Sequence, residues 1–223
     1  MVNRLAVFDC DGTLVDSQAA ICRAMDECFS CHGLTPPHRQ ATRRIVGLSL
    51  PQIMRTLAPA ADPDLQAALV DAYRVTFQRH RAEGLVEEPL FDGIAETVDR
   101  LENAGWLLGV ATGKSDRGLR LCLERHRLHA RFMTLQTADR HPSKPHPAML
   151  QAAMAEAGAA PETTVMIGDT SFDMMMAAAA GAHALGVGWG YHSTDELRSA
   201  GAHGVVESPQ DLTVWMERFT DGR

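Results

Sequence analysis

The sequence predicts an α/β protein in which a parallel sheet carries helices on both faces and is interrupted by an all-helical insertion. After about Pro89, short apolar runs alternate with helical periodicity, as in strands joined by crossover helices. Between Ser17 and Pro89 the periodicity is helical, with almost no strand signal. We therefore predict an α/β core formed by residues 1–16 and 90–223, and a helical domain formed by residues 17–89.

The chain opens with a buried strand at residues 5–8, which is a short and fully apolar run. The helical insertion follows at once. Ser17 is a typical N-cap for a helix that ends near Gly33, and Asp62-Pro63 starts a long helix. Two shorter helices are expected between them, at residues 39–46 and from Pro51 onward.

The rest of the chain alternates between strands and helices. Strands are expected at residues 106–111, 132–135, 164–167, 184–187 and 204–206. Helices are expected after Asp92-Gly93, around Leu119 and Leu123, and at residues 147–157 and 171–180. Such alternation predicts parallel pairing, and ligands of such sheets bind at the carboxyl ends of the strands.

Composition excludes several classes of protein. The formal net charge of -7 argues against general nucleic-acid binding. No apolar run is long enough to span a membrane. Without a signal-peptide pattern we expect a cytoplasmic protein, in which five cysteines do not imply a disulfide framework. Cys28, Cys31 and His32 match the spacing of haem attachment, but their helical context favours core packing, and the sequence assigns them no role.

Two aspartates end the first strand. Asp9 and Asp11 are one residue apart, and alternation along an extended chain predicts that their side chains point to the same side. Two like charges so close destabilise each other unless a cation, a proton or a pKa shift relieves them. The alternative is an ordinary Asp-rich surface turn after a strand.

Polar residues also follow the later strands. Thr112 and Gly113 follow the second strand, Lys144 precedes a helix start, and Asp169 and Asp173 follow the strand at residues 164–167. All of these groups can meet at one edge of one sheet. Several carboxylates form an oxygen-rich site that suits Mg²⁺, whereas a hydroxyl, backbone N–H groups and a lysine suit a phosphoryl group. Each group alone could instead cap a helix or lie in solvent.

This combination predicts phosphoryl chemistry. Asp9 is the natural nucleophile, because a carboxylate can accept a phosphoryl group, and Asp11 can act as the general acid and base. Lysine is also rare here: only Lys114 and Lys144 occur among 21 basic residues, which suggests positions where a compact ammonium is needed.

These motifs resemble those of haloacid dehalogenase superfamily phosphatases with a helical cap, over nearly the whole chain. Asp9 to Ser17 resembles the first motif, residues 110–113 the second, Lys144 the third, and Gly168-Asp169 with Asp173 the fourth. The resemblance implies a Rossmann-like core and Mg²⁺ held by Asp9, the Asp11 backbone carbonyl and Asp169, with Asp173 in support. It also implies that Thr112, Gly113 and Lys144 bind the phosphate of a small phosphorylated metabolite.

Within this superfamily, phosphatases similar to phosphoglycolate phosphatase fit best. A sugar-phosphate mutase or a pyrophosphatase on the same core stays open, as does a catalytically silent interaction protein. Residues of the cap would select the substrate, with Arg43, Arg44, Gly47 and Leu48 as a candidate loop whose arginines could bind a second anionic group or simply lie in solvent. The sequence does not distinguish a monomer from a homodimer.

Overall fold

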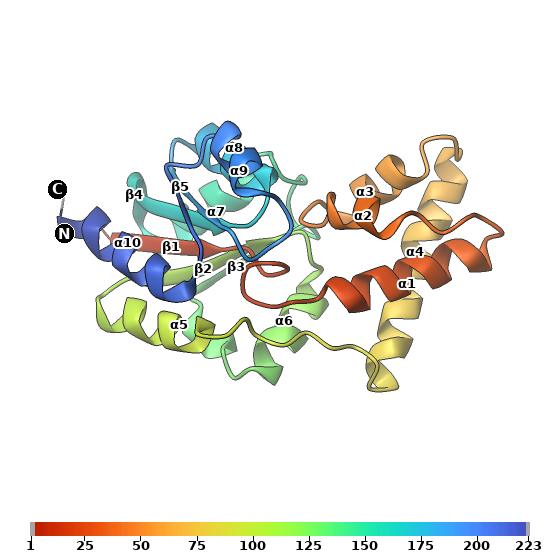
Figure 1. The fold of residues 1–223 in the computed structure, drawn as a ribbon, viewed down its shortest axis with the longest axis horizontal. Coiled ribbons are helices and arrows are strands. Elements are labelled where there is room, and N and C mark those ends of the chain that lie inside the picture. Colours follow the sequence, from red (N-terminus) through yellow and green to blue (C-terminus); the bar gives the residue numbers. More distant parts are fainter. Residues whose placement is uncertain (1–2, 222–223) are drawn as a thin grey trace.

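A computed structural model describes residues 3–221 and confirms the α/β fold class (Figure 1). Six parallel strands form one sheet in the order β3-β2-β1-β4-β5-β6. The strands are β1 (Asn3–Phe8), β2 (Leu107–Thr112), β3 (Thr134–Thr137), β4 (Ala159–Gly168), β5 (His183–Val187) and β6 (Gly204–Val206). The chain ends assigned to the predicted core, residues 1–2 and 222–223, lie outside the described residues.

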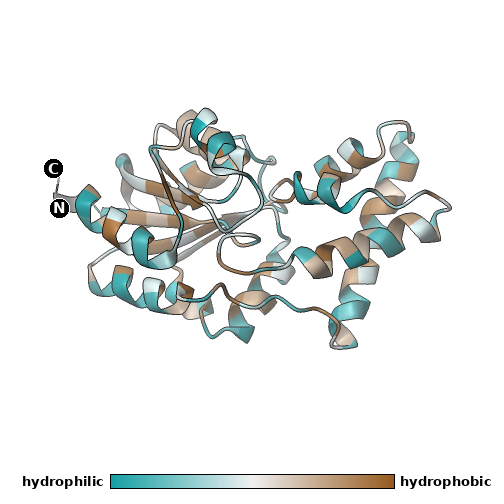
Figure 2. Ribbon diagram, viewed as in Figure 1, coloured by the Kyte–Doolittle hydropathy of each residue, from teal (hydrophilic) through white to brown (hydrophobic). Residues whose placement is uncertain are grey.

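The central strand β1 is buried on both faces. Ala6 and Phe8 pack into one hydrophobic cluster, and Leu5 and Val7 into another on the opposite face. Alternation along the strand thus divides a continuous apolar run between two cores, as expected of a sheet covered on both sides. Figure 2 shows hydrophobic residues on the strands and on the helices beside them, and also on the helices at the right of the view.

Three helices cover each face of the sheet. One layer contains α5 (Ile94–Asn103), α6 (Asp116–Arg125) and α10 (Pro209–Asp221), and the other contains α7 (Ala148–Ala157), α8 (Ser171–Ala180) and α9 (Thr194–Ser199). A short 3₁₀ turn (His129–Arg131) follows α6. Among the described residues, no helix combines the length and the apolarity that crossing a membrane requires.

The helices of the insertion lie beyond the carboxyl ends of the strands (Figure 1). They are α1 (Gln18–Cys31), α2 (Arg39–Arg43), α3 (Leu50–Leu57) and α4 (Pro63–Ala82). Apolar residues of α1, α3 and α4, among them Met25, Met54 and Leu69, form a separate cluster. This group of helices therefore has a small core of its own.

The chain enters and leaves the helical insertion at one place. The amide of Asp16 donates to the carbonyl of Pro89 at 2.9 Å, and Phe91 N donates to Leu14 O at 3.1 Å. An isolated antiparallel bridge joins Val15 to Leu90 between them. The two connections are thus hydrogen-bonded to each other directly after the Asp9–Asp11 turn.

Several predicted boundaries are wrong for local reasons. The helix expected at residues 39–46 ends at Arg43, because the chain turns toward Gly47, whose φ is 102°. Strand β3 begins at Thr134 rather than residue 132, since its register follows from pairing with Gly109 of β2. Strand β4 begins at Ala159 rather than residue 164. Helices α9 and α10 were not expected.

The cysteines of the haem-like spacing belong to the packing of α1. Cys28 is buried in the core of the insertion, and its thiol donates to the carbonyl of Leu69 at 3.2 Å. Cys31 is exposed, and the His32 ring contacts the carbonyl of Cys28 at 2.9 Å. The core-packing interpretation therefore accounts for Cys28.

Candidate active site

Asp9 lies where the central strand ends. Its amide donates to Ile167 O at 2.8 Å and so extends the pairing of β1 with β4 by one residue. The side chain is fully buried, and its Oδ1 accepts a 2.6 Å hydrogen bond from the amide of Cys10. The other oxygen, Oδ2, is buried and has no hydrogen-bond partner among the described residues. An unpaired carboxylate oxygen in such a place is costly unless a ligand occupies it.

Asp169 and Asp173 join Asp9 from the neighbouring strand and helix. One oxygen from each of the three carboxylates lies within 4.8 Å of the others, and all three residues are buried. Asp169 follows β4 and accepts hydrogen bonds from the Thr13 hydroxyl at 2.7 Å and the Tyr191 amide at 3.0 Å. The sequence-predicted carboxylates from two strand ends therefore do meet.

The position of Asp173 follows from helix capping. It is the third residue of α8, and its Oδ2 accepts hydrogen bonds from the Thr170 amide at 3.1 Å and the Thr170 hydroxyl at 2.7 Å. This capping box fixes the carboxylate at the helix start. Its Oδ1 remains available and contacts Lys144.

Lys144 supplies positive charge to this cluster. Its Nζ lies 3.0 Å from Asp9 Oδ1 and 2.6 Å from Asp173 Oδ1, and its side chain is completely buried. Burial alone would lower the pKa of Lys144, but Asp173 and Asp9 raise that pKa above its ordinary value. The lysine therefore remains charged between the two carboxylates.

One lysine does not neutralise three carboxylates. Burial raises the pKa of Asp9 to about 7, Lys144 opposes the rise, and the charges of Asp173 and Asp11 add to it. Burial and the Asp9 and Asp173 charges likewise raise the pKa of Asp169 well above its ordinary value. The site thus has an excess of negative charge that a cation would relieve.

Asp11 lies apart from this carboxylate cluster. Its Oδ1 accepts a hydrogen bond from the Ser17 hydroxyl and lies 2.8 Å from Lys114 Nζ. The expectation from strand alternation is therefore wrong in detail: β1 ends at Phe8, and Gly12, with a φ of 86°, turns the chain. The charges of Asp11 and Asp9 still interact, but their side chains have different partners.

Thr112 and Gly113 lie at the end of β2. Thr112 is buried, and its hydroxyl accepts from the Lys114 amide at 3.3 Å. A Cβ on Gly113 would lie 2.6 Å from the carbonyl oxygen of Gly47 and would also overlap that of Leu48. The loop between α2 and α3 therefore packs directly on the predicted phosphate-binding turn.

The candidate substrate loop divides into two parts. Gly47 approaches Asp9, because a Cβ there would lie 3.7 Å from Asp9 Oδ2. In contrast, Arg44 pairs with Glu196 and is half exposed, so its side chain does not reach the carboxylate cluster. Arg43 donates to Gly190 O at 2.8 Å, with its guanidinium over the Tyr191 ring. Arg44 thus joins the insertion to α9 of the core, and Arg43 joins it to the loop that contains Gly190.

The close packing at Gly113 leads to a testable prediction. Gly113→Ala should lower kcat/KM by about 10–100-fold, because the added methyl would displace the Gly47–Leu48 loop by a fraction of an ångström to an ångström. Thermal stability should fall as well, because the atoms that must move belong to the backbone. Steady-state kinetics and calorimetry measure the two effects, with Gly118→Ala in α6 as the matched control. Unchanged kinetics in a folded Gly113→Ala protein would contradict a functional role for this contact.

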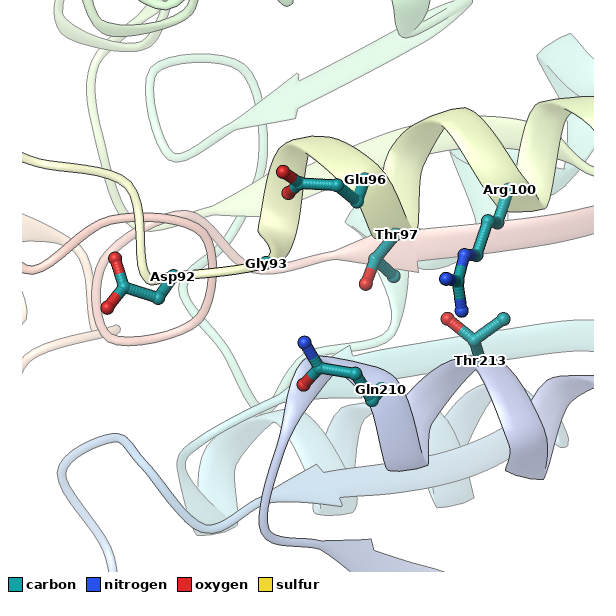
Figure 3. A pocket seen from close by; sticks show the side chains of 7 residues that line it. All are labelled: Asp92, Gly93, Glu96, Thr97, Arg100, Gln210 and Thr213. Carbon is teal, nitrogen blue, oxygen red and sulfur yellow. The ribbon is translucent and has the colours of Figure 1, made fainter.

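A separate groove of about 260 Å³ lies between α5 and α10 (Figure 3). Its lining contains none of the residues predicted to act: it consists of Asp92, Gly93, Glu96, Thr97, Arg100, Gln210 and Thr213. The groove and the buried carboxylate cluster therefore have no residue in common.

Sequence reasoning missed several residues that contact the site. Thr13 and Tyr191 bind Asp169, Ser17 binds Asp11, and Glu88 binds Lys114. The rarity of lysine pointed to Lys114, and Thr13 and Ser17 lie within the first motif, but neither signal indicated these contacts. The others are common residue types whose partners depend on the folded loops.

A parallel sheet whose strand ends bring together buried carboxylates and a lysine defines an α/β enzyme suited to phosphoryl groups. The chain belongs to the haloacid dehalogenase-like hydrolase family, whose sequence model matches residues 6–187.

Its relatives include phosphatases. The chain is 36% identical over 210 residues to the probable phosphatase IndB of Dickeya dadantii, covering 92% of this chain and 89% of that protein. It is 32% identical over 219 residues to a phosphoglycolate phosphatase of Xylella fastidiosa, covering 95% and 93%. A predicted phosphatase from Clostridium acetobutylicum superposes with a TM-score of 0.87 at 25% identity, over 98% of this chain and 100% of that one. The chain is thus a phosphatase of this family.

Proposed function

We propose that the protein hydrolyses a small phosphate monoester of the phosphoglycolate type, with Mg²⁺, through an aspartyl-phosphate at Asp9. The observation that carries the proposal is the buried and unpaired Asp9 Oδ2, next to Lys144 and two further carboxylates. The name of the Xylella fastidiosa relative supports this substrate class.

The donor set fits Mg²⁺. Buried carboxylate oxygens without nitrogen or sulfur ligands suit a hard divalent cation. Asp9 and Asp169 would hold the ion together with the Asp11 backbone carbonyl, while Asp173 would support Lys144. When bound, the ion would supply positive charge that offsets repulsion between Asp9 and the phosphate.

The residues of the chain would have separate roles in phosphate binding, nucleophilic attack and proton donation. Lys144, Thr112 and the amide of Gly113 would bind the phosphoryl oxygens. Asp9 Oδ2 would attack phosphorus, since Oδ1 already accepts from Cys10 N and contacts Lys144. The bond from phosphorus to the leaving oxygen breaks, and Asp11 donates the proton that this oxygen takes up.

Hydrolysis of the intermediate restores the enzyme. Water attacks phosphorus of the aspartyl-phosphate, its proton passes to Asp11, and the bond between phosphorus and Asp9 Oδ2 breaks. Phosphate then leaves. Residues 17–89 would act as a cap that excludes bulk water, consistent with the Gly47–Leu48 loop next to Asp9.

A panel of phosphorylated metabolites tests this function. With Mg²⁺ present, we expect free phosphate from at least one small monoester, loss of activity with a chelator, and recovery when Mg²⁺ is restored. An isomer formed without free phosphate would indicate a mutase. Activity that a chelator does not affect would contradict the metal site, and no turnover of any ester would contradict the substrate class.

The raised carboxyl pKa values predict a pH-dependent response to Mg²⁺. Folded Asp9 has a pKa of about 7 against an ordinary 3.8, so the folded chain binds more protons than the unfolded chain between these values. The metal-free protein should therefore lose stability as pH rises through this range. Because Mg²⁺ competes with those protons, it should raise Tm more at about pH 8 than at about pH 5. Calorimetry would contradict this if the Mg²⁺ effect were the same at both.

A further inference from the structure

The two lysines of the chain occupy equivalent environments. Lys144 bridges Asp9 and Asp173, as described above. Lys114 bridges Asp11 and Glu88: its Nζ lies 2.8 Å from Asp11 Oδ1 and 2.7 Å from Glu88 Oε1. Each lysine thus connects one aspartate of the first motif to a second buried carboxylate. The function proposed above uses Lys144 and leaves Lys114 without a role.

Lys114 belongs to a line of alternating charges. Arg81, near the end of α4, donates to Glu88 Oε2 at 2.7 Å, while Glu88 Oε1 accepts from Lys114. Glu88 lies in the segment that returns from the helical insertion, and its side chain is fully buried. In this line the cations Arg81 and Lys114 alternate with the carboxyl groups of Glu88 and Asp11. They lead from the insertion to the proposed general acid.

The charges in this line stabilise one another. Burial would raise the pKa of Glu88, but Lys114 and Arg81 bring that pKa below its ordinary value. Burial would lower the pKa of Lys114, but Asp11 and Glu88 raise it well above its ordinary value. Lys114 therefore stays charged at its place, and a bridging ammonium of this kind fixes the carboxylates on either side.

The two oxygens of Asp11 differ as a result. Oδ1 is used twice, by the Ser17 hydroxyl and by Lys114. Oδ2 has no hydrogen-bond partner among residues 3–221. Oδ2 is therefore the oxygen of Asp11 that can face a leaving group, since Oδ1 already faces two donors.

We propose that Lys114 is a positioning residue for Asp11: it holds Oδ1 so that Oδ2 presents its proton to the leaving group, and Glu88 fixes Lys114 from the segment that returns from the insertion. This inference rests on the proposed function. It assigns Lys114 no contact with the phosphate. It ties the position of the acid to the segment through which the helical insertion is attached.

A role of Lys114 in positioning the acid can be tested by comparing substrates whose leaving groups differ in their need for a proton. An aryl phosphate with a stable phenolate needs little proton donation, whereas an alkyl phosphate needs a well-placed acid. We compare kcat/KM for p-nitrophenyl phosphate and for the best alkyl phosphate of the panel, in Lys114→Met and Glu88→Gln. The alkyl-to-aryl ratio of kcat/KM should fall about tenfold or more in Lys114→Met. It should fall by a smaller factor in Glu88→Gln. In both variants the change should be in kcat, with KM nearly unchanged.

A double variant distinguishes a loss of function from misfolding caused by an unpaired buried charge. Lys114→Met/Glu88→Gln removes one charge of each sign, so it keeps the balance between Asp11 and Arg81. It should fold and show a ratio no lower than that of Lys114→Met alone, because both residues act through one contact. Arg74→Met, on an exposed ion pair of α4, is the control and should keep the wild-type ratio. An equal loss on both substrates, or no loss, in the folded variants would overturn the proposal.

The Asp11→Asn variant separates the two levels of inference. It should show the same dependence on the leaving group, more strongly. If the rate of Asp11→Asn did not depend on the leaving group in this way, Asp11 could not be the acid assigned in the proposed function. If Asp11→Asn showed this dependence on the leaving group and the Lys114 variants did not, only the role of Lys114 would be overturned.

Discussion

Asp9→Asn is expected to lower the turnover of an aryl phosphate by at least about 10⁴-fold. Asparagine has nearly the same shape, but its amide cannot accept a phosphoryl group reversibly as a carboxylate does. The metal-free protein should at the same time become more stable. The substitution removes one of three crowded buried carboxylates, and its amide N–H groups can bind the neighbouring carboxylates.

The matched control is Asp16→Asn, the same substitution at an exposed carboxylate seven residues along the same segment. It should keep wild-type kinetics and stability. Phosphate release and thermal unfolding are measured for both proteins. Substantial activity in purified Asp9→Asn would refute the nucleophile, and a loss of stability would contradict the picture of a strained carboxylate cluster.

Lys144→Met is expected to lower activity by about 10²–10³-fold or more and also to destabilise the metal-free protein by about 3–5 kcal/mol. The lysine is the cation in contact with Asp9 and Asp173, and its side chain is completely buried. Its loss leaves two buried carboxylates without their partner. Kinetics and denaturant unfolding, with Arg74→Met as the control for removal of an exposed charge, measure both effects.

A second substitution separates the two roles of Lys144. In Lys144→Met/Asp173→Asn one carboxylate charge is removed together with the lysine, so much of the lost stability should return. Activity should not return, because the ammonium that would bind the phosphoryl group is still missing. Recovery of activity along with stability would show that Lys144 is needed only for folding.

The strand ends were predictable because they combine two strong signals. A fully apolar run followed by Asp or Gly, as at Phe8-Asp9 and Gly168-Asp169, indicates a buried parallel strand and its polar end. Parallel topology then requires these ends to meet. The sequence therefore indicates that Asp9 and Asp169 are neighbours, although it does not give the distance between them.

The orientation of Asp11 was not predictable in this way. Alternation applies only while the chain is extended, and β1 ends before Asp9. Glu88 gave no signal either, since it lies in an irregular segment without periodicity, and its contact with Lys114 depends on the insertion folding back. Loop conformation decides both cases, and single-sequence patterns describe loops poorly.

Two missed helices did carry local signals. Ser193 and Glu196 form a capping box at the start of α9. Asp211 N donates to the Ser208 hydroxyl at 3.2 Å, with Pro209 as the first residue of α10. A search for helix starts would have indicated both, whereas the apolar periodicity of a six-residue helix such as α9 is too short to do so.

Trapping the covalent intermediate tests the central claim most directly. The wild-type enzyme is acid-quenched during turnover of its best substrate, digested, and examined by mass spectrometry for an added phosphoryl group. The account predicts that this group is on the peptide containing Asp9, at Asp9 itself, and is absent from Asp9→Asn. A phosphoryl group on another residue would contradict the account. The Asp11→Asn variant should accumulate the intermediate from an aryl phosphate. If Asp9 carried no phosphoryl group in either the wild-type enzyme or Asp11→Asn, the account would also be contradicted.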